Sequence, residues 1–401
     1  MPFRLSMSDL RAYGENMALR RTWKEVRRVT QDQWSNAAAA FRANPYVRIE
    51  ASLPDYDAVF GRGTPSLTYR LCVTSDPARR IPFIQAPGSD GWLASFRIMA
   101  RGSNPNITVK SNGTIASEMY TLAKLPGGKY DVNAGYQSFT NIPAPTGYFK
   151  DAAGRAAANQ QLRNYIQTFY WFVQNDPTVP SAVRERFRPF GLCADEFVDN
   201  GGWPYQPYVR EGRRIVGRDD LTVGDIFINR QKTDAVAVGS YYVDSKTSQW
   251  VFAGGALHRD VSVFSSAPVY EIPFAAMVPT FGSVTNLLAP VGLSASPTAY
   301  GSVRMEPQYM ALGQAAGLAT SLASREALSV AALPASRVQS LLRSDGVAYT
   351  AVSVCQRTPV AARQTYGFST TCALLTVTPD ARSGTQPAGD GSDWPLGYNG
   401  G

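Results

Sequence analysis

Histidine and cysteine are scarce in this chain of 401 residues, which contains one histidine, His258, and four cysteines. No two cysteines form a Cys-x-x-Cys pair, and a single imidazole leaves too few ligands for a zinc or iron–sulfur centre. Nucleophilic catalysis of the Ser-His-Asp type would have to use His258, and no Gly-x-Ser-x-Gly elbow is present. We therefore expect no metal site, and we interpret His258 as a solvated or hydrogen-bonded loop histidine.

Long apolar runs are also missing. No stretch approaches the ~18 consecutive apolar residues of a membrane span, and residues 1–21 lack the apolar core of a secretory signal. The compartment stays open, because glycosylation triplets begin at Asn106 and Asn112 but such triplets often occur by chance. Cys355 and Cys372 could pair in an oxidising compartment or remain buried thiols.

The charge is unbalanced, with 39 basic and 31 acidic side chains and a net charge of +8. Arginines concentrate within residues 18–28 and 184–218, but no nucleic-acid-binding module surrounds them. We interpret them as solvated faces or as a site for an anionic ligand, and we expect no nucleic-acid partner. The acidic cluster of Asp195, Glu196 and Asp199 is interpreted as a solvated turn. Hydrophobic residues, at 44%, suffice for two or three domains.

Local patterns predict several elements in the first 284 residues. The clearest is a helix over 155–174, where Leu162, Ile166, Phe169 and Val173 recur at helical spacing. The other expected elements are a capped helix from Ser8, a strand over 66–73, a short helix over 182–188, a strand over 235–243 and a hairpin turn at Gly254 and Gly255.

Residues 286–318 form a second informative stretch. We expect a buried strand over 286–294, a turn at Gly301, and a helix over 309–324 with Pro307 in its first turn. Gly313 and Gly317 are predicted to allow close helix packing. A strand, a turn and a helix N-terminus make a general anion site, to which Ser302 and Arg304 would add donors. A last helix over 334–343 is expected to end at Gly346.

Several segments together resemble the FAD-dependent oxidoreductase family whose members are often labelled xanthan-lyase-like. The most specific is Asp195-Glu-Phe-Val-Asp-Asn-Gly-Gly-Trp-Pro, and the closing segment includes Ala299-Tyr-Gly-Ser-Val-Arg-Met-Glu-Pro. The other similar stretches, in chain order, are 69–83, 125–133, 175–180, 207–217, 239–245, 286–295 and 310–317.

This resemblance implies an α/β chain, α+β overall, with a glutathione-reductase-like FAD domain into which a mixed-sheet substrate domain is inserted. The implied division is a helical and irregular N-terminal segment (1–64), the substrate domain (65–284), the closing strand and helices of the FAD domain (285–347), and an extension (348–401) that is largely disordered after residue 378. Because no Gly-x-Gly-x-x-Gly follows a strand anywhere, we expect the FAD domain to be incomplete and the chain to be truncated.

The resemblance also implies site residues. Those expected against the flavin and its ribityl–pyrophosphate arm are Tyr300, Gly301, Ser302, Arg304 and Met305, with the following helix directing its dipole at the flavin N1/O2 edge. Those expected in the cleft between cofactor and substrate are Arg210, Arg213 and Arg214, and we nominate Arg210, Arg214 and Asp244 as catalytic.

Two departures from the family pattern bear on catalysis. Histidines that relatives carry are replaced by Lys246 and Thr247 at one place and by Pro297 at another. The favoured function is hydride transfer between an organic, carbohydrate-type small molecule and flavin N5. The alternatives are an inactive carbohydrate-binding or structural remnant of the same fold, and a polysaccharide lyase using Tyr205 and Arg210.

Overall fold

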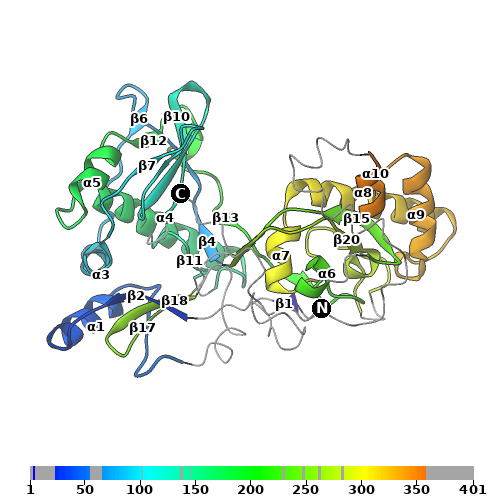
Figure 1. Ribbon diagram of the computed structural model, residues 1–401, viewed down its shortest axis with the longest axis horizontal. Helices are drawn as coiled ribbons and strands as arrows, with labels where there is room; N and C mark the ends of the chain where they lie inside the picture. The colour runs from blue at the N-terminus through cyan, green and yellow to red at the C-terminus, as the bar shows by residue number, and fades with distance from the viewer. Residues whose placement is uncertain are drawn as a thin grey trace.

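The computed structural model forms two lobes, and a short sheet of three strands, hereafter the central sheet, lies on the side of the first lobe that faces the second (Figure 1). It describes residues 3–4, 23–54, 66–101, 103–135, 139–145, 147–227, 231–245, 249–260, 263–280 and 284–357. The expected helix from Ser8, the departures at Lys246 and Thr247, Cys372 and the expected disorder after residue 378 lie outside these ranges. No helix among the described residues is long and apolar enough to cross a membrane.

The first lobe is built on a seven-stranded sheet with the order β6-β12-β5-β10-β9-β8-β7. Its strands are β5 (Leu71–Thr74), β6 (Arg80–Ile81), β7 (Thr108–Val109), β8 (Ile115–Ala116), β9 (Tyr120–Lys124), β10 (Lys129–Ala134) and β12 (Gly191–Cys193). Its helices are α1 (Trp34–Arg42), α3 (Asp90–Ala100), α4 (Ala152–Asn175) and α5 (Ser181–Phe187).

Helix α4 confirms the prediction from helical spacing. The side chain of Asp151 accepts a hydrogen bond from the Gly154 amide at 2.7 Å, which caps the first turn. Leu162, Ile166 and Phe169 all lie in the core, as the spacing requires. The short helix predicted over 182–188 is likewise present as α5.

A four-stranded sheet in the first lobe corrects two predictions. Its order is β2-β18-β17-β3, formed by β2 (Trp23–Arg28), β3 (Arg48–Ile49), β17 (Trp250–Ala253) and β18 (Ala256–Asp260). The hairpin turn at Gly254 and Gly255 is confirmed, and both glycines have positive φ. Within the N-terminal segment that was expected to be helical and irregular, residues 23–28 instead form strand β2. His258 lies within β18 and is buried, so the loop assignment was wrong.

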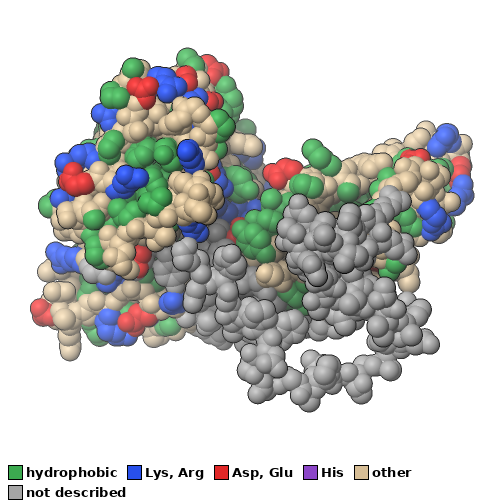
Figure 2. Space-filling model, turned by 45° about the horizontal axis from the view of Figure 1, so that its top comes forward, with side chains coloured by type: hydrophobic (Ala, Val, Ile, Leu, Met, Phe, Trp, Pro, Cys, Tyr) green, Lys and Arg blue, Asp and Glu red, His purple; other side chains and the backbone are tan. Residues whose placement is uncertain are grey.

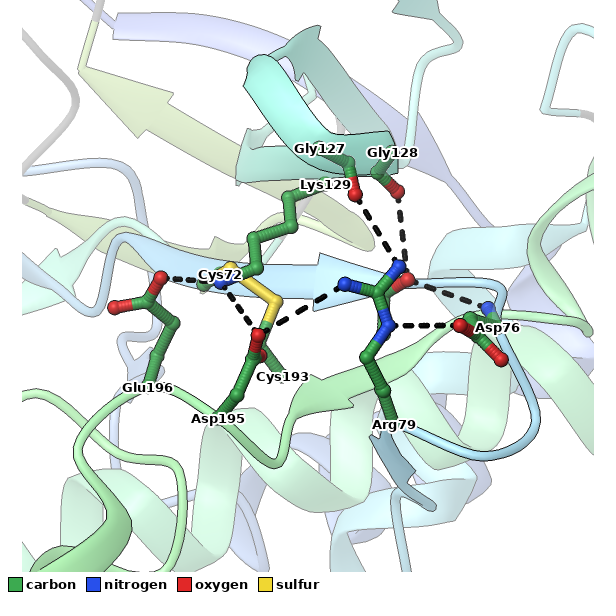
Figure 3. Close-up of a disulfide and its surroundings, with 10 residues drawn as sticks. Cys72, Asp76, Arg79, Gly127, Gly128, Lys129, Cys193, Asp195 and Glu196 are labelled. Atoms are coloured by element: carbon green, nitrogen blue, oxygen red, sulfur yellow. Dashed lines mark hydrogen bonds and ion pairs between the residues drawn. A yellow bond between two sulfur atoms is a disulfide. The ribbon is translucent and has the colours of Figure 1, made fainter.

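A disulfide joins Cys72 on β5 to Cys193 on β12, with Cα atoms 5.5 Å apart (Figure 3). Sequence analysis did not predict this pair, which is separated by 121 positions. Beside it, Lys129 forms ion pairs with both Asp195 and Glu196. The acidic turn is therefore partly neutralised and linked to the sheet by Lys129.

The central sheet has the order β11-β4-β13 and consists of β4 (Ser66–Thr68), β11 (Ile142–Pro143) and β13 (Tyr208–Val209). The strand predicted over 66–73 is thus two strands, β4 and β5, interrupted at Tyr69 and Arg70. Leu67 pairs with Ile142 on one side and with Val209 on the other. This sheet places Tyr208 and the residues after it between the lobes.

The second lobe packs helices against short strand pairs. Its strands are β14 (Arg214–Ile215), which pairs with β1 (Phe3–Arg4), β15 (Ala235–Gly239), β16 (Val243–Ser245), β19 (Val263–Ser265) and β20 (Tyr270–Pro273). Its helices are α6 (Val223–Phe227), α7 (Pro297–Val303), α8 (Glu306–Arg325), α9 (Ala335–Ser344) and α10 (Ala351–Arg357). The predicted strand over 235–243 appears as β15, which ends at Gly239.

Three predictions for residues 286–318 were wrong. Residues 286–294 form no strand, and Val291 is 54% exposed, because an apolar run alone does not distinguish an exposed loop from a buried strand. Gly301 lies inside α7, whose cap is Ser296, with Pro297 in the first turn. Gly313 and Gly317 face open space.

Other features of the second lobe match the sequence. Pro307 lies in the first turn of α8, as predicted. Helix α9 is followed by Gly346, whose φ of 72° fits the expected helix stop. On the face shown in Figure 2, basic and acidic side chains are interspersed over the surface of the first lobe.

Candidate functional site

A cavity of about 500 Å³ lies where the two lobes meet. The charged side chains that line it are Arg70, Arg210, Arg213, Arg304 and Glu306, and the aromatic ones are Tyr208, Tyr300 and Tyr309. A somewhat larger cavity of about 570 Å³ lies among β2, α1 and α3, but none of the predicted site residues lines it. We therefore take the cavity between the lobes, hereafter the arginine cavity, as the candidate site.

Arg304 is held by Asp244 in a buried ion pair. The Nη2 atom of Arg304 lies 2.9 Å from Oδ2 of Asp244, and both residues are 7% exposed. Gly301 makes this approach possible, because a Cβ there would lie only 3.2 Å from the Asp244 carbonyl oxygen. Burial alone would lower the pKa of Arg304, but Asp244 and Tyr208 outweigh it and raise that pKa. Arg304 is thus a fixed cation whose partner is not the neighbouring Glu306.

Arg210 follows β13 and has a different environment. It is 6% exposed, donates to the Asn141 side-chain oxygen at 3.4 Å, and lies over the Tyr208 ring at 4.9 Å. Within the described residues, no carboxylate lies at ion-pair distance from it. Burial lowers the pKa of Arg210 to about 10; the more distant Asp244 opposes this effect, and Arg304 adds to it. Arg210 still carries its charge near neutral pH.

Tyr300 is fixed from both sides. Its hydroxyl donates to the Val291 carbonyl at 2.9 Å and accepts from the Tyr309 hydroxyl at 2.7 Å. The Arg214 guanidinium lies 4.9 Å from the ring centroid. Burial raises the pKa of Tyr300, so it remains a neutral hydroxyl.

Arg214 supports Tyr300 from outside the arginine cavity. It is 1% exposed and is paired with Glu211 at 3.4 Å. Its Nε and Nη2 atoms are buried and have no hydrogen-bond partner. Arg213 lines the cavity and donates to the Phe149 carbonyl oxygen.

The remaining predicted cofactor residues point elsewhere. The Ser302 hydroxyl donates to the Tyr241 carbonyl and accepts from the Tyr270 hydroxyl at 2.8 Å, so it is fully used inside the second lobe. Gly301 packs against β16, and Met305 is half-buried just before α8. The structure therefore places two of the five predicted residues, Tyr300 and Arg304, on the cavity wall.

Sequence analysis missed Arg70, Tyr208 and Tyr309 as cavity residues. Tyr208 lies within a segment that carried the family resemblance, and it was given no role there. The Arg70 guanidinium lies 5.7 Å from the Tyr208 ring centroid, although Arg70 lies between β4 and β5 and is 138 positions from Tyr208. Only the central sheet, which joins β4 to β13, brings these two residues together.

The donors of the cavity fit part of a flavin nucleotide. The Nε atom of Arg304 is buried and has no hydrogen-bond partner, which suits an oxygen acceptor such as a flavin carbonyl or phosphate. Nearby, the N-terminus of α8 adds a favourable dipole for negative charge. No group of His, Cys, Asp and Glu able to hold a metal is found among the described residues.

A family model described as FAD dependent oxidoreductase matches residues 2–342. Neither the curated proteins nor the solved structures contain a match to the chain.

Proposed function

The chain belongs to the FAD-dependent oxidoreductase family, and we propose that the arginine cavity is where it holds the flavin end of FAD and oxidises an organic small molecule. FAD supplies a two-electron acceptor at N5. The observation that carries this proposal is the buried Arg304, which lines the cavity, is oriented by Asp244 and has an Nε donor without a hydrogen-bond partner.

Each residue of the wall has a distinct task in this proposal. Arg304 stabilises negative charge on the reduced flavin ring, and Asp244 keeps its guanidinium in place. Tyr300 forms a neutral wall that Tyr309 and Arg214 hold in position. With its pKa raised by burial, Tyr300 orients a ligand through its ring rather than by releasing a proton.

We propose further that the ADP half of FAD is held by sequence outside this chain, because these 401 residues contain no dinucleotide-binding Gly-x-Gly-x-x-Gly. For the substrate, we propose a carbohydrate-type molecule, which the xanthan-lyase-like resemblance supports. Binding of the flavin end is therefore the part of the proposal that can be tested with this chain alone.

The test measures binding of FMN, which carries only the flavin end, to the full chain by quenching of flavin fluorescence. Arg304→Ala is expected to make the binding free energy of FMN less favourable, or to raise the activation barrier of flavin reduction, by about 2–4 kcal/mol. This is the scale of losing one preorganised charged donor. Arg42→Ala is the matched control, since Arg42 is exposed on α1 and lines neither cavity. Equal FMN affinity and equal reduction rates in wild type and Arg304→Ala would refute the assignment.

The two alternatives differ in their support. An inactive binding protein predicts no flavin binding by wild type in the same titration. A lyase gains no support from Tyr205, whose hydroxyl donates to Asp199 at 2.8 Å. That hydrogen bond raises the pKa of Tyr205, which opposes its use as a base.

A further inference from the structure

We propose that Arg210 binds an anionic group of the substrate, a carboxylate, sulfate or phosphate, inside the arginine cavity. This inference rests on the proposed function, since it names the chemical class of the molecule that the same site would oxidise. Its basis is that Arg210, unlike Arg70 and Arg304, has no carboxylate at ion-pair distance among the residues that the structure describes.

The cavity wall carries four guanidinium groups and one carboxylate, Glu306, which is exposed. Two of the four cations have acidic partners behind the wall: Arg70 is paired with Asp131, and Arg304 with Asp244. Arg210 has only the amide oxygen of Asn141 at 3.4 Å and the face of the Tyr208 ring.

Asp244 cannot neutralise both of the buried arginines beside it. Its Oδ2 atom lies 2.9 Å from Arg304, while its effect on Arg210 is a longer-range attraction. Arg304 and Arg70 both repel the charge on Arg210. The group of Arg210, Arg304 and Asp244 therefore has a net positive charge, although each of the three residues is at most 7% exposed.

A buried guanidinium without a counter-charge is costly, and an incoming anion recovers part of that cost. The planar fork of arginine suits carboxylate, sulfate and phosphate, to which it can donate two parallel hydrogen bonds. Tyr208 restricts the orientation of that fork, because its ring lies 4.9 Å from Arg210 and 5.7 Å from Arg70. Arg210 is thus charged, fixed and open to the cavity.

The experiment compares a matched pair of sugars, glucuronate and glucose, at constant ionic strength. Binding to the full chain is measured by calorimetry with and without FMN, and inorganic phosphate is the second anionic probe. We expect saturable binding of glucuronate, no comparable binding of glucose, and at least a tenfold loss of glucuronate affinity in Arg210→Gln. Arg42→Gln, which removes the same charge from the surface, should bind like wild type.

A second variant guards against misfolding of Arg210→Gln, which circular dichroism would detect. Arg70→Gln alters a partly exposed side chain on the same wall and should weaken glucuronate binding by a smaller factor. Equal affinity for glucuronate in wild type, Arg210→Gln and Arg70→Gln, or no anion binding by wild type, would overturn the inference.

The arms with FMN separate this inference from the proposed function. Glucuronate that binds the FMN-loaded chain without displacing FMN supports a substrate anion. Anions that compete with FMN would assign Arg210 to the cofactor phosphate and overturn the substrate assignment. FMN binding without any anion binding would leave the proposed function standing and refute the inference, whereas Arg210-dependent glucuronate binding without FMN binding would count against the flavin proposal alone.

Discussion

The two lobes are stabilised by different kinds of packing. The first lobe has an aromatic core in which Phe96 contacts the rings of Phe139, Tyr165, Phe169 and Phe172 at centroid distances of 5.3–5.8 Å, and a disulfide ties two of its strands together. In the second lobe, α8 instead turns small side chains toward the core. The first lobe is therefore stabilised by aromatic packing and a disulfide, whereas the face of α8 in the second core consists mainly of alanine side chains.

The arginine cavity takes its residues from both lobes. Arg210 belongs to the chain that leaves the central sheet, and Arg304 ends α7 of the second lobe. The shape of such a site depends on how the two lobes are placed. Changes to the packing of the first lobe and changes to the packing of the second lobe should therefore have different effects on the cavity. Four predictions test this contrast.

The largest effect is expected from removing the disulfide. Cys72→Ser with Cys193→Ser should lower the free energy of unfolding by about 4–5 kcal/mol, because the bridge spans 121 positions. Every tryptophan in the described residues lies between 23 and 250, in the first lobe, so tryptophan fluorescence during urea unfolding reports this loss. An unchanged unfolding midpoint, with or without reductant, would show that the bridge does not stabilise this lobe.

Breaking the buried ion pair should have the next largest effect. Asp244→Asn leaves Arg304 without its counter-charge and is expected to destabilise the chain by about 3 kcal/mol. The double variant Asp244→Asn with Arg304→Gln should be less destabilised than the sum of the single variants, with a coupling of about 1–3 kcal/mol. Strict additivity in thermal or urea unfolding would contradict the pairing.

Enlarging a small residue in the second lobe should cost less. Ala315 is fully buried on α8, so Ala315→Leu is expected to destabilise by about 1–3 kcal/mol through overpacking. Gly313 lies on the same helix facing open space, and Gly313→Ala should stabilise by about 0.5–1 kcal/mol. The free energy of unfolding of both variants can be measured by circular dichroism in the tyrosine region. An unchanged free energy of unfolding in Ala315→Leu would show that the core of the second lobe can accommodate a larger side chain at this position.

The smallest effect concerns His258, the one imidazole of the chain. Burial lowers its pKa below 6.5; Glu25 opposes that effect and Arg28 adds to it. The folded state therefore binds the proton less readily than the unfolded state, so stability is lost as the pH falls below about 6.5, the pKa of an unfolded histidine. The single histidine resonance in NMR should titrate below the free value, and His258→Gln should flatten this part of the stability profile. A resonance that titrates at or above 6.5 would contradict the burial of the ring.

Local patterns predicted the parts of the fold that depend on neighbouring residues. Helix α4 follows from the spacing of Leu162, Ile166 and Phe169, and the β17–β18 hairpin follows from Gly254 and Gly255. Strand β2 was missed because its partner β18 lies more than 220 positions further along the chain, where periodicity carries no information.

The candidate site was predictable only in part for the same reason. Arg304 and Asp244 were both nominated through the family resemblance, but their pairing depends on the packing of α7 against β16. The segment around Val291, which lines the cavity, was wrongly predicted to be a buried strand, because an exposed apolar loop beside a cavity has the same composition. One local signal was available and unused: Ser296 followed by Pro297 marks the start of α7.

The most direct test of the central claim is a crystal structure of the full chain with a bound flavin nucleotide. Density for the flavin ring is expected in the arginine cavity, in contact with Tyr300 and Arg304 and with Arg210 facing the open side. Density for the flavin in the cavity among β2, α1 and α3, or anywhere away from Arg304, would contradict it.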